Sequence, residues 1–282
     1  MGTIQVKFLG GAAGARVVDN GRAGLGRFAL PKGGPVDGVA HLNGARLVGN
    51  GPTQVVVEIP LRGGQWQLTG SGVLAFTGAD MDWNVNGKAL PLNTPRKFSD
   101  EATLRGEYAR SGQYGYLHIG GEWQLADNFG SVQPLLPSHL EIQPGWECTV
   151  ISKPYQESEN ETLPEPLPSS NWYTFTPGLE WSGLSEAWRS ALLTYKYLIS
   201  PTSNRQGIRL RPALPFPDLS PPPAIISSPV LPGTLQFTGE EIIVLGPDAQ
   251  TIGGYPRLGW VDADVLARLY QARLGTQVAI TH

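Results

Sequence analysis

The residues best suited to binding a small molecule stand in the turn at residues 250–257, which reads Gln-Thr-Ile-Gly-Gly-Tyr-Pro-Arg. Gly253 and Gly254 allow positive φ and let main-chain N–H groups come close to a neighbour. Pro256 restricts the residue before it, so the ring of Tyr255 has a defined direction. Such a turn can hold a polar ligand with main-chain donors beneath an aromatic ring. The alternative is a strand-to-helix corner in which Tyr255 only fills space.

Several other kinds of chemistry lack their motifs in this sequence. Gly87-Lys88 has neither the upstream glycine nor the following hydroxyl of a phosphate-binding loop, and no Gly-x-Ser-x-Gly elbow occurs. The four histidines are isolated and Cys148 is the only cysteine, which excludes a thiolate zinc site, so we expect no metal. We interpret His118 as a residue of an apolar strand and Cys148 as a small buried hydrophobe. No lysine adjoins a methionine, so the chain has no biotin attachment site of its own.

The composition favours many short strands joined by tight turns. Of the 282 residues, 40% are hydrophobic and only 16% are charged, with 36 glycines and 25 prolines. A net charge of −3 without a basic block argues against nucleic acid or an anionic membrane surface as a partner. One cysteine fits a reducing compartment, and the N-terminal residues have no signal-peptide pattern. No apolar run approaches the roughly 18 residues of a membrane span, so we expect a cytoplasmic protein.

The first half of the chain is predicted to be mostly strand. Alternating or β-rich runs lie at residues 4–8, 55–59, 65–68, 73–77, 103–108 and 114–119. Glycines at 63–64 and 70–72 give hairpin spacing between successive runs, and Asn86-Gly87 is the strongest hairpin signal. Asp37 is predicted to cap a helix that stops at Gly49-Asn50. The apolar side of that helix is expected at Val39, Leu42 and Leu47.

The second half is predicted to hold two helices and further strands. The clearest helix lies at residues 184–195, capped by Ser182 or Ser185, and another runs from Asp262 to about residue 272. Strands are expected at 241–246 and 276–281. The proline-dense stretch 212–232 forbids a central strand and suggests an extended crossing segment. Val36-Asp37 and Val261-Asp262 each precede a helix containing Ala-Arg-Leu, which suggests a duplicated barrel.

Short motifs spread over nearly the whole chain resemble one family. In the first half they are Asp19-x-Gly21-Arg22-x-Gly24, Leu30-Pro31-x-x-Gly34-x-x-Asp37, Leu47-Val48-Gly49-Asn50, Val57-Glu58, Thr77-Gly78-Ala79-Asp80, Tyr116-Leu117 with Gly120-Gly121, and Gly130-Ser131. In the second half they are Ser203-Asn204-Arg205-x-Gly207-x-x-Leu210, Pro232-Gly233-Thr234-x-Gln236 and Gln250-Thr251-x-Gly253-Gly254-Tyr255-Pro256. Their order resembles the C subunit of bacterial ATP-dependent 5-oxoprolinase. The same family is labelled allophanate hydrolase subunit 2 and KipA, the antagonist of the kinase inhibitor KipI.

The resemblance implies a mainly β fold of two cyclophilin-like β-barrel domains, each with about one helix. We place the N-terminal barrel at residues 1–150, a linker or long surface loop at 151–171 and the C-terminal barrel at 172–282, although strands can exchange between the halves. The resemblance also implies a KipI-like B subunit and a separate A subunit as partners. The complex would use ATP to open 5-oxoproline to glutamate, and biotin would sit only on a partner, in a carboxyltransferase-like reaction.

The resemblance also selects candidate site residues, because a planar anionic group needs fixed hydrogen-bond donors. The proposed catalytic residues are Arg22, Asp80, Arg205 and Tyr255. The proposed substrate-binding residues are Asp37, Thr77, Gly78, Gly121, Ser131, Asn204, Gln236, Gly253 and Gly254. The two arginines offer planar forks, and the glycines offer close main-chain donors. Structural alternatives stand beside these roles: Asp37 as an N-cap, Asp80 as a turn cap, and Arg22 as the ion-pair partner of Asp19.

Three loops depart from the family pattern. Arg16 and Val18 stand where Thr and Gln are usual, and Gly33 stands where Ser is usual. Val132, Gln133 and Pro134 replace a usual Arg-Ser-Thr. Polar groups facing a ligand are therefore exchanged for apolar ones, which bears on the substrate and on activity.

Three functions are consistent with the sequence. The first is the C component of a 5-oxoprolinase-type complex, inactive alone. The second is a KipA-like regulator that binds a KipI-like protein and keeps that association after Arg205→Ala or Tyr255→Ala. The third is an allophanate hydrolase subunit 2 or a carboxyltransferase component like that of urea carboxylase, which product analysis with urea and a biotin carboxyl carrier would identify.

Overall fold

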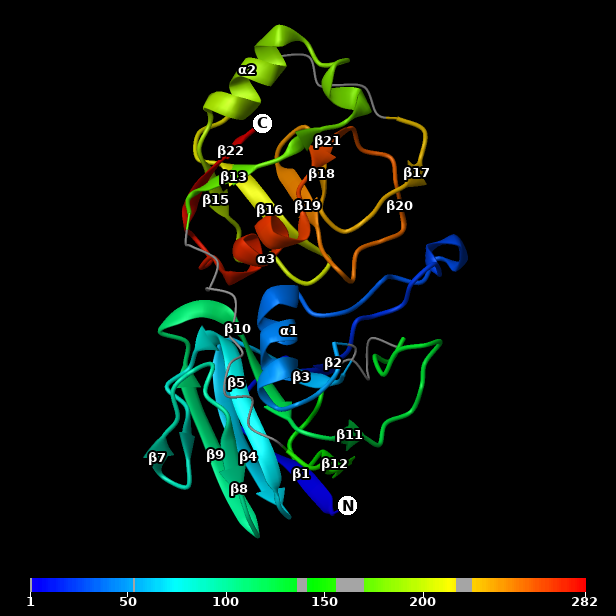
Figure 1. Ribbon diagram of the computed structural model, residues 1–282. Coiled ribbons are helices and arrows are strands. Elements are labelled where there is room, and N and C mark those ends of the chain that lie inside the picture. Colours follow the sequence, from blue (N-terminus) through cyan, green and yellow to red (C-terminus); the bar gives the residue numbers. More distant parts are fainter. Residues whose placement is uncertain (1, 53, 136–140, 156–169, 217–224) are drawn as a thin grey trace. The chain divides into compact units, whose positions relative to one another are not determined.

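The computed structural model describes residues 2–52, 54–135, 141–155, 170–216 and 225–282 (Figure 1). The chain separates into two compact units, one of residues 1–22 and 33–166 and the other of residues 23–32 and 167–282. The short stretch 23–32 groups with the second unit, which no local sequence pattern predicted. Most of the predicted linker at 151–171 and part of the proline-dense stretch at 212–232 lie outside the described residues.

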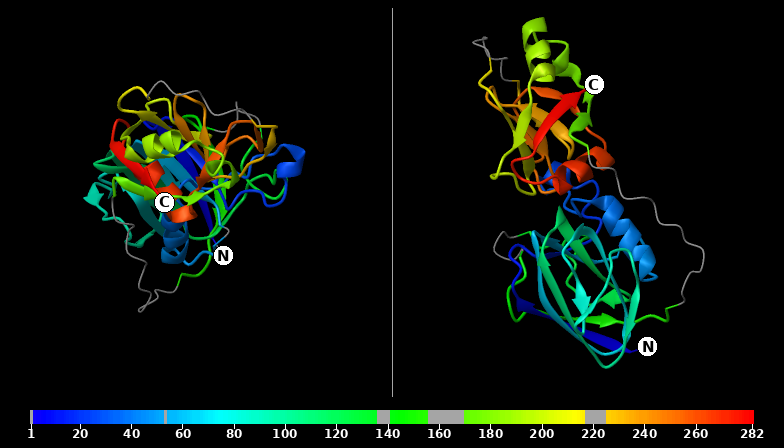
Figure 2. Two further views of the ribbon diagram at one scale, coloured as in Figure 1. Left: turned by 90° about the horizontal axis from the view of Figure 1, so that it is seen from above. Right: turned by 90° about the vertical axis from the view of Figure 1, so that its left-hand side faces the viewer.

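Two antiparallel sheets build the N-terminal unit. The first has the order β11-β12-β1-β4-β9-β6-β7, with β1 (Thr3–Gly10), β4 (Arg62–Thr69), β6 (Asn84–Val85), β7 (Lys88–Ala89), β9 (Glu101–Tyr108), β11 (Glu122–Trp123) and β12 (Glu147–Ile151). The second has the order β2-β3-β10-β5-β8, with β2 (Arg16–Val18), β3 (Val56–Pro60), β5 (Gly72–Asp80), β8 (Arg96–Phe98) and β10 (Ser111–Ile119). Figure 2 shows these strands wrapping around a common interior.

One apolar core lies between the two sheets. Buried side chains such as Phe8, Trp66, Phe76 and Leu104 come from strands of both sheets. The strand β1 alternates buried and exposed residues, as its period-two pattern predicted. In this strand every second side chain enters the core and most of the others are exposed, so the local pattern was sufficient to predict β1.

The predicted hairpins at residues 63–64 and 70–72 are wrong. Strands β3, β4 and β5 alternate between the two sheets, so successive strands do not pair with one another. The corner between β3 and β4 falls at Leu61, and Gly63 lies inside β4. A Cβ on Gly63 would stand 2.8 Å from the ring of Trp83, so this glycine permits close packing instead of a turn. The Asn86-Gly87 hairpin is confirmed, with φ of 51° and 74°, by the pairing of β6 with β7.

Helix α1 (Gly38–Leu47) packs on the second sheet through small and polar residues. Its N-cap is Asp37, whose carboxylate accepts a hydrogen bond of 2.9 Å from the Ala40 amide. The buried residues are Ala40, His41, Asn43, Gly44 and Ala45. The predicted apolar side, at Val39, Leu42 and Leu47, is only half-buried. Figure 1 shows α1 alongside β10 and β5, which present Tyr116, His118 and Thr77 to this helix.

One larger sheet builds the C-terminal unit. Its order is β13-β22-β15-β16-β19-β18-β21-β14, with β13 (Trp172–Thr174), β14 (Thr176–Pro177), β15 (Tyr197–Ile199), β16 (Gly207–Pro212), β18 (Thr234–Phe237), β19 (Ile242–Leu245), β21 (Arg257–Trp260) and β22 (Gln277–Thr281). A two-stranded ribbon joins β17 (Ser228–Pro229) to β20 (Ile252–Gly253). Short 3-10 turns lie at Gly26–Phe28 and Leu179–Trp181.

Two helices complete the C-terminal unit as described. Helix α2 (Glu186–Thr194) is capped by Ser185, which accepts a 3.2 Å hydrogen bond from the Trp188 amide. Helix α3 (Ala263–Gln271) is capped by Asp262. Both helices lie where they were predicted. Of the two predicted N-cap residues of α2, Ser182 and Ser185, the structure shows Ser185. The mainly β fold with barrel-like sheets is confirmed, and the described residues hold one α-helix in the first unit and two in the second.

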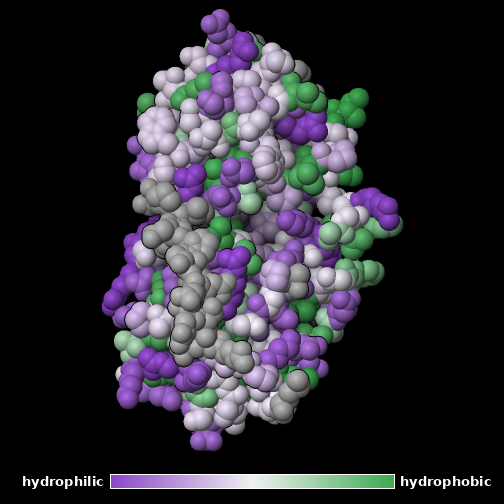
Figure 3. Space-filling view, viewed as in Figure 1, coloured by the Kyte–Doolittle hydropathy of each residue, from purple (hydrophilic) through white to green (hydrophobic). Residues whose placement is uncertain are grey.

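The surface mixes polar and apolar residues. Figure 3 shows hydrophobic residues in small separate groups on the face that it draws. Within the described residues, no helix has the length and apolar character needed to cross a bilayer.

The contact between α1 and the sheet predicts a stability difference between two glycines of the same helix. A Cβ on Gly44 would overlap the buried imidazole of His118, whereas one on Gly38 would meet nothing within 4 Å. We expect Gly44→Ala to lower the free energy of unfolding by about 1–3 kcal/mol, as overpacked cores do. Gly38→Ala should leave it unchanged or slightly higher. Urea denaturation of both variants checks this, and equal midpoints would show that α1 does not press on His118.

Candidate functional site

The turn at residues 250–257 packs on a buried glutamine of β18. Gln236 is 1% exposed, and its Oε1 accepts a 3.2 Å hydrogen bond from Nε2 of Gln250. Its own Nε2 has no hydrogen-bond partner among the described residues. A Cβ on Gly253 would overlap this amide nitrogen. The absence of a side chain at Gly253 therefore lets the main chain contact the Gln236 amide closely. Neither Gly253 nor Gly254 adopts the positive φ that the sequence suggested.

A second buried polar atom belongs to the residue that pairs with the same glycine. Ser228 pairs with Gly253 in the β17–β20 ribbon, and its Oγ also has no hydrogen-bond partner among the described residues. Buried polar atoms without partners are rare in folded proteins, because the lost hydrogen bonds to water are not replaced. Two of them beside one glycine mark a place where a ligand or an ordered water can bind.

The rim of this site is aromatic and charged. Tyr255 is 49% exposed, so it is not the packing plug of the alternative interpretation. Arg257 donates to both carboxylate oxygens of Glu180. Those hydrogen bonds lower the pKa of the Glu180 carboxyl, which keeps this ion pair charged. The exposed ring of Tyr255 is available to cover a ligand held at Gly253.

Arg205 and Asn204 have structural partners in the C-terminal unit. Arg205 is 6% exposed and holds the carboxylate of Asp248 with two hydrogen bonds, of 2.7 and 2.8 Å. Asn204 accepts hydrogen bonds from the Gln206 amide and the Tyr270 hydroxyl. A bidentate buried pair of this kind is expensive to break. The guanidinium fork predicted to bind substrate is thus engaged by Asp248.

Arg22 binds the loop that departs from the family pattern. Its Nε donates to the Asn128 carbonyl over 2.8 Å, and Nη2 donates to the Gln133 carbonyl. The Gln133 side chain in turn accepts a hydrogen bond from the Gly34 amide. Main-chain donors and the arginine fork that could hold an anion are therefore taken by this loop.

Asp19 and Ser131 belong to the same network. Asp19 accepts hydrogen bonds from the Gly21 amide, the Ser131 hydroxyl and the Val132 amide, at 2.8, 2.6 and 2.8 Å. The predicted pairing of Asp19 with Arg22 is replaced by these contacts. Ser131, a predicted substrate ligand, is 2% exposed and donates to Asp19.

Glu58 was not among the predicted site residues. It is 1% exposed in β3, and Oε2 accepts hydrogen bonds from the Val36 amide and the Tyr116 hydroxyl, at 2.9 and 3.0 Å. The Tyr116 oxygen also accepts a hydrogen bond from the Asp37 amide. Burial, and then the nearby Glu58, raise the pKa of the Tyr116 hydroxyl well above its ordinary value. A charged residue within the apolar run at 55–59 was the signal that could have identified Glu58.

Thr77 lies under α1 and contacts a buried histidine. Its hydroxyl donates to the Ala40 carbonyl over 2.8 Å and stands 3.0 Å from Nε2 of His118. Because the single hydroxyl proton goes to Ala40, the proton in the second contact comes from His118. Burial, and then the neighbouring His41, lower the pKa of His118 well below its ordinary value. Burial also lowers the pKa of His41, whose Nε2 contacts the Gln54 carbonyl.

The remaining predicted residues of the N-terminal unit have turn or packing roles. A Cβ on Gly78 would overlap the Tyr114 carbonyl, and one on Gly121 would overlap the Ile151 carbonyl. The Gly121 amide donates to the Asn50 side chain over 2.9 Å. Asp80 accepts from the Asp82 amide at 3.1 Å, the turn-cap contact offered as its alternative role. Asp37 likewise has the N-cap role. No group of three or more His, Cys, Asp or Glu side chains in the described residues could hold a metal ion.

The fold and these loops define a carboxyltransferase-like protein. The chain belongs to the carboxyltransferase domain family, subdomains A and B, whose model matches residues 28–282. It is 28% identical over 280 residues to the C subunit of 5-oxoprolinase from Haemophilus influenzae, covering 94% of this chain and 86% of that protein. A putative urea carboxylase of Emericella nidulans is 28% identical over 278 residues, which are 92% of this chain but 22% of that protein.

A solved structure shows the same fold. The crystal structure of TTHA0988 superposes with a TM-score of 0.87 at 25% identity, over 99% of this chain and 56% of that one. The chain thus spans little more than half the length of that protein. The family resemblance inferred from the motifs is confirmed.

The buried histidines predict a loss of stability in weak acid. A histidine whose folded pKa lies below its ordinary value of 6.5 binds fewer protons when folded than when unfolded. Its contribution is therefore complete above about pH 6.5 and is lost as the pH falls toward the folded pKa. We expect the free energy of unfolding to drop between about pH 7 and 5.5, and less steeply in His118→Gln. The exposed His282→Gln is the control, and a slope in His118→Gln equal to that of the parent would contradict the assignment.

Proposed function

We propose that this chain is the C component of a 5-oxoprolinase-type complex, acting with a KipI-like B subunit and an A subunit. The observation that carries the proposal is the 28% identity to the C component of a bacterial 5-oxoprolinase, 86% of which is covered. Only 22% of the urea carboxylase relative is covered, which favours a component of the smaller enzyme. In the proposed reaction water is added across the lactam C–N bond of 5-oxoproline to give glutamate, and the complex hydrolyses ATP.

The site at Gly253 suits this substrate chemically. A lactam carbonyl is a hydrogen-bond acceptor, and the unpaired Nε2 of Gln236 is a donor buried beside Gly253. Donors that are already oriented stabilise the charge that develops on such an oxygen during reaction. The half-exposed ring of Tyr255 would cover the bound ring. In this proposal the residues of the turn bind and orient, and no covalent nucleophile is required.

Reconstitution tests the proposal directly. The chain alone should be inactive, whereas the chain assembled with its B and A partners should hydrolyse ATP only when 5-oxoproline is present. Tyr255→Ala should lower that turnover by about tenfold or more while the complex still forms, because only the cover over the ligand is lost. A folded three-component complex without 5-oxoproline-dependent ATP hydrolysis would remove this function.

Gln236→Met separates a ligand donor from a structural residue. Gln236→Met removes the donor Nε2, which has no partner among the described residues, and also the acceptor of the 3.2 Å hydrogen bond from Gln250, so the two effects oppose each other and the free energy of unfolding should change by no more than about 1 kcal/mol. The same change should reduce turnover of the reconstituted complex by about tenfold to a hundredfold. Gln277→Met, at an exposed position of β22, is the matched control and should change neither. Full turnover in Gln236→Met would exclude the site at Gly253.

A regulatory function is the second candidate, favoured by the loop that engages Arg22 and Gly34. In the N-terminal unit the donors suited to an anion bind Gln133 and Asn128 of the same chain. A protein that only sequesters a KipI-like partner needs no donors for an anionic substrate, so their engagement within the chain would not impair its function. It would bind that partner equally well after Tyr255→Ala and Gln236→Met, and no assembled complex would turn over 5-oxoproline.

A further inference from the structure

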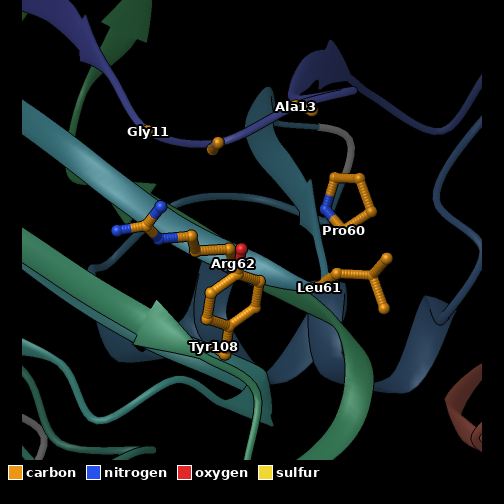
Figure 4. Close-up of a pocket in the computed structure, with 7 residues that line it drawn as sticks. Gly11, Ala13, Pro60, Leu61, Arg62 and Tyr108 are labelled. Atoms are coloured by element: carbon orange, nitrogen blue, oxygen red, sulfur yellow. The ribbon is translucent and has the colours of Figure 1, made fainter.

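A pocket of about 420 Å³ opens on the N-terminal unit (Figure 4). Residues 11–13, the corner at residues 60–62 and Tyr108 line it. This volume is in the range of pockets that bind small molecules. None of these residues belongs to the predicted site or to the Gly253 turn, so the pocket is independent of the proposed function.

Arg62 supplies the positive charge of this pocket. Its guanidinium lies 5.0 Å from the centre of the Tyr108 ring, and Figure 4 shows its side chain extended between that ring and the loop of Gly11. The buried Nε of Arg62 has no hydrogen-bond partner among the described residues. A guanidinium presents five N–H donors. A carboxylate accepts hydrogen bonds from two of them at once, whereas the face of an aromatic ring offers no comparable acceptor.

Two carboxylates near this part of β4 in the sequence of strands, Glu107 of β9 and Asp82 of the loop after β5, are bound by other arginines. Glu107 accepts a 2.7 Å contact from Arg105, and Asp82 accepts a 2.6 Å contact from Arg110. The described residues therefore leave Arg62 with an aromatic neighbour and no carboxylate. An anion entering the pocket would supply the missing acceptor.

Leu61 gives the pocket an apolar edge at a conformational cost. It has φ of 62°, where a bulky residue is rare, and its side chain is 49% exposed. Two main-chain hydrogen bonds hold it there, from its amide to the Gln113 carbonyl and from the Ala109 amide to its own carbonyl, at 2.6 and 2.8 Å. Strained backbone positions are enriched at binding sites, and this one presents a leucine side chain to solvent at the edge of the pocket.

Small residues make up the opposite wall of the pocket, Gly11, Ala12 and Ala13. A Cβ on Gly64 would stand 2.7 Å from the Gly10 carbonyl and 2.9 Å from the Ala12 amide, so the loop after β1 rests directly on β4. The wall therefore presents main chain and methyl groups to the pocket, which suits a flat or narrow ligand.

We propose that this pocket binds a small monocarboxylate carried on a short apolar group. The carboxylate would bind Arg62, and the apolar group would pack between Leu61, Pro60 and the Tyr108 ring. The combination of a guanidinium whose buried Nε lacks a partner among the described residues with three side chains that offer apolar surface, Pro60, Leu61 and Tyr108, favours an anionic ligand with an apolar group over a neutral or a strongly polar one.

The test uses the full chain and two pairs of probes, pentanoate with pentanamide and benzoate with benzamide, observed by saturation-transfer NMR. We expect the carboxylates to bind and the amides to bind about tenfold more weakly, because the charge-assisted hydrogen bonds are absent. Arg62→Gln should weaken carboxylate binding by about tenfold. The matched control Arg105→Gln, whose side chain is 56% exposed on the adjacent strand, should bind as the parent does.

Leu61→Gly keeps the proposal testable if Arg62→Gln perturbs folding. Glycine accepts φ of 62° without strain, so the unfolding midpoint should stay or rise while binding of pentanoate weakens. Equal binding of acids and amides, equal losses in Arg62→Gln and Arg105→Gln, or unchanged binding in Leu61→Gly would each overturn the proposal. None of these outcomes bears on 5-oxoproline turnover, which is measured in the assembled complex.

Discussion

The structure depends on the pairing of polar groups that folding removes from water. Helix α1 lies on the second sheet of the N-terminal unit through Ala40, His41 and Gly44, and not through an aliphatic stripe. The face of the sheet that contacts this helix carries Thr77, His118 and Tyr116, and each of these side chains makes a hydrogen-bond contact with a polar neighbour. Such a layer is stable only if its members are nearly all satisfied, because an unpaired polar group is costly in a medium of low dielectric. It therefore determines the position and rotation of α1.

The candidate loops of the two units differ in how far their buried polar groups are paired. In the N-terminal unit, Arg22, Asp19 and Gly34 are held by residues 128–133 of the same chain. In the C-terminal unit, Gln236 and Ser228 each keep a buried polar atom without a described partner beside Gly253. Exchanging the usual Arg-Ser-Thr for Val132, Gln133 and Pro134 is consistent with this difference. Gln133 adds an acceptor that reaches the Gly34 amide, so a departure from the family pattern has become part of the internal network.

Membership of the carboxyltransferase domain family and the location of the unpaired polar atoms support a common interpretation. Relatives of this chain include one component of a 5-oxoprolinase and a much larger putative urea carboxylase. The shared fold supplies glycine-containing corners where main chain and side-chain amides approach each other closely. Chemistry on such a scaffold depends on which donors remain unpaired in a place that a ligand can reach, and two such places among the described residues are the turn at Gly253 and the pocket at Arg62.

The sequence by itself determined the elements whose cause is local. Asp37, Ser185 and Asp262 cap their helices through residues three positions away, Asn86-Gly87 forms its hairpin, and period-two alternation marks β1. The family followed from motif order. Only the tertiary structure decided which sheet each successive strand joins and which side of α1 is buried. It showed that Gly253 is needed for close contact with Gln236 and not for a positive φ. It also decided the partners of Arg22 and Arg205, since these lie up to 111 and 43 residues away along the chain. A side chain's hydrogen-bonding partner is set by packing between distant segments, and no local pattern encodes it.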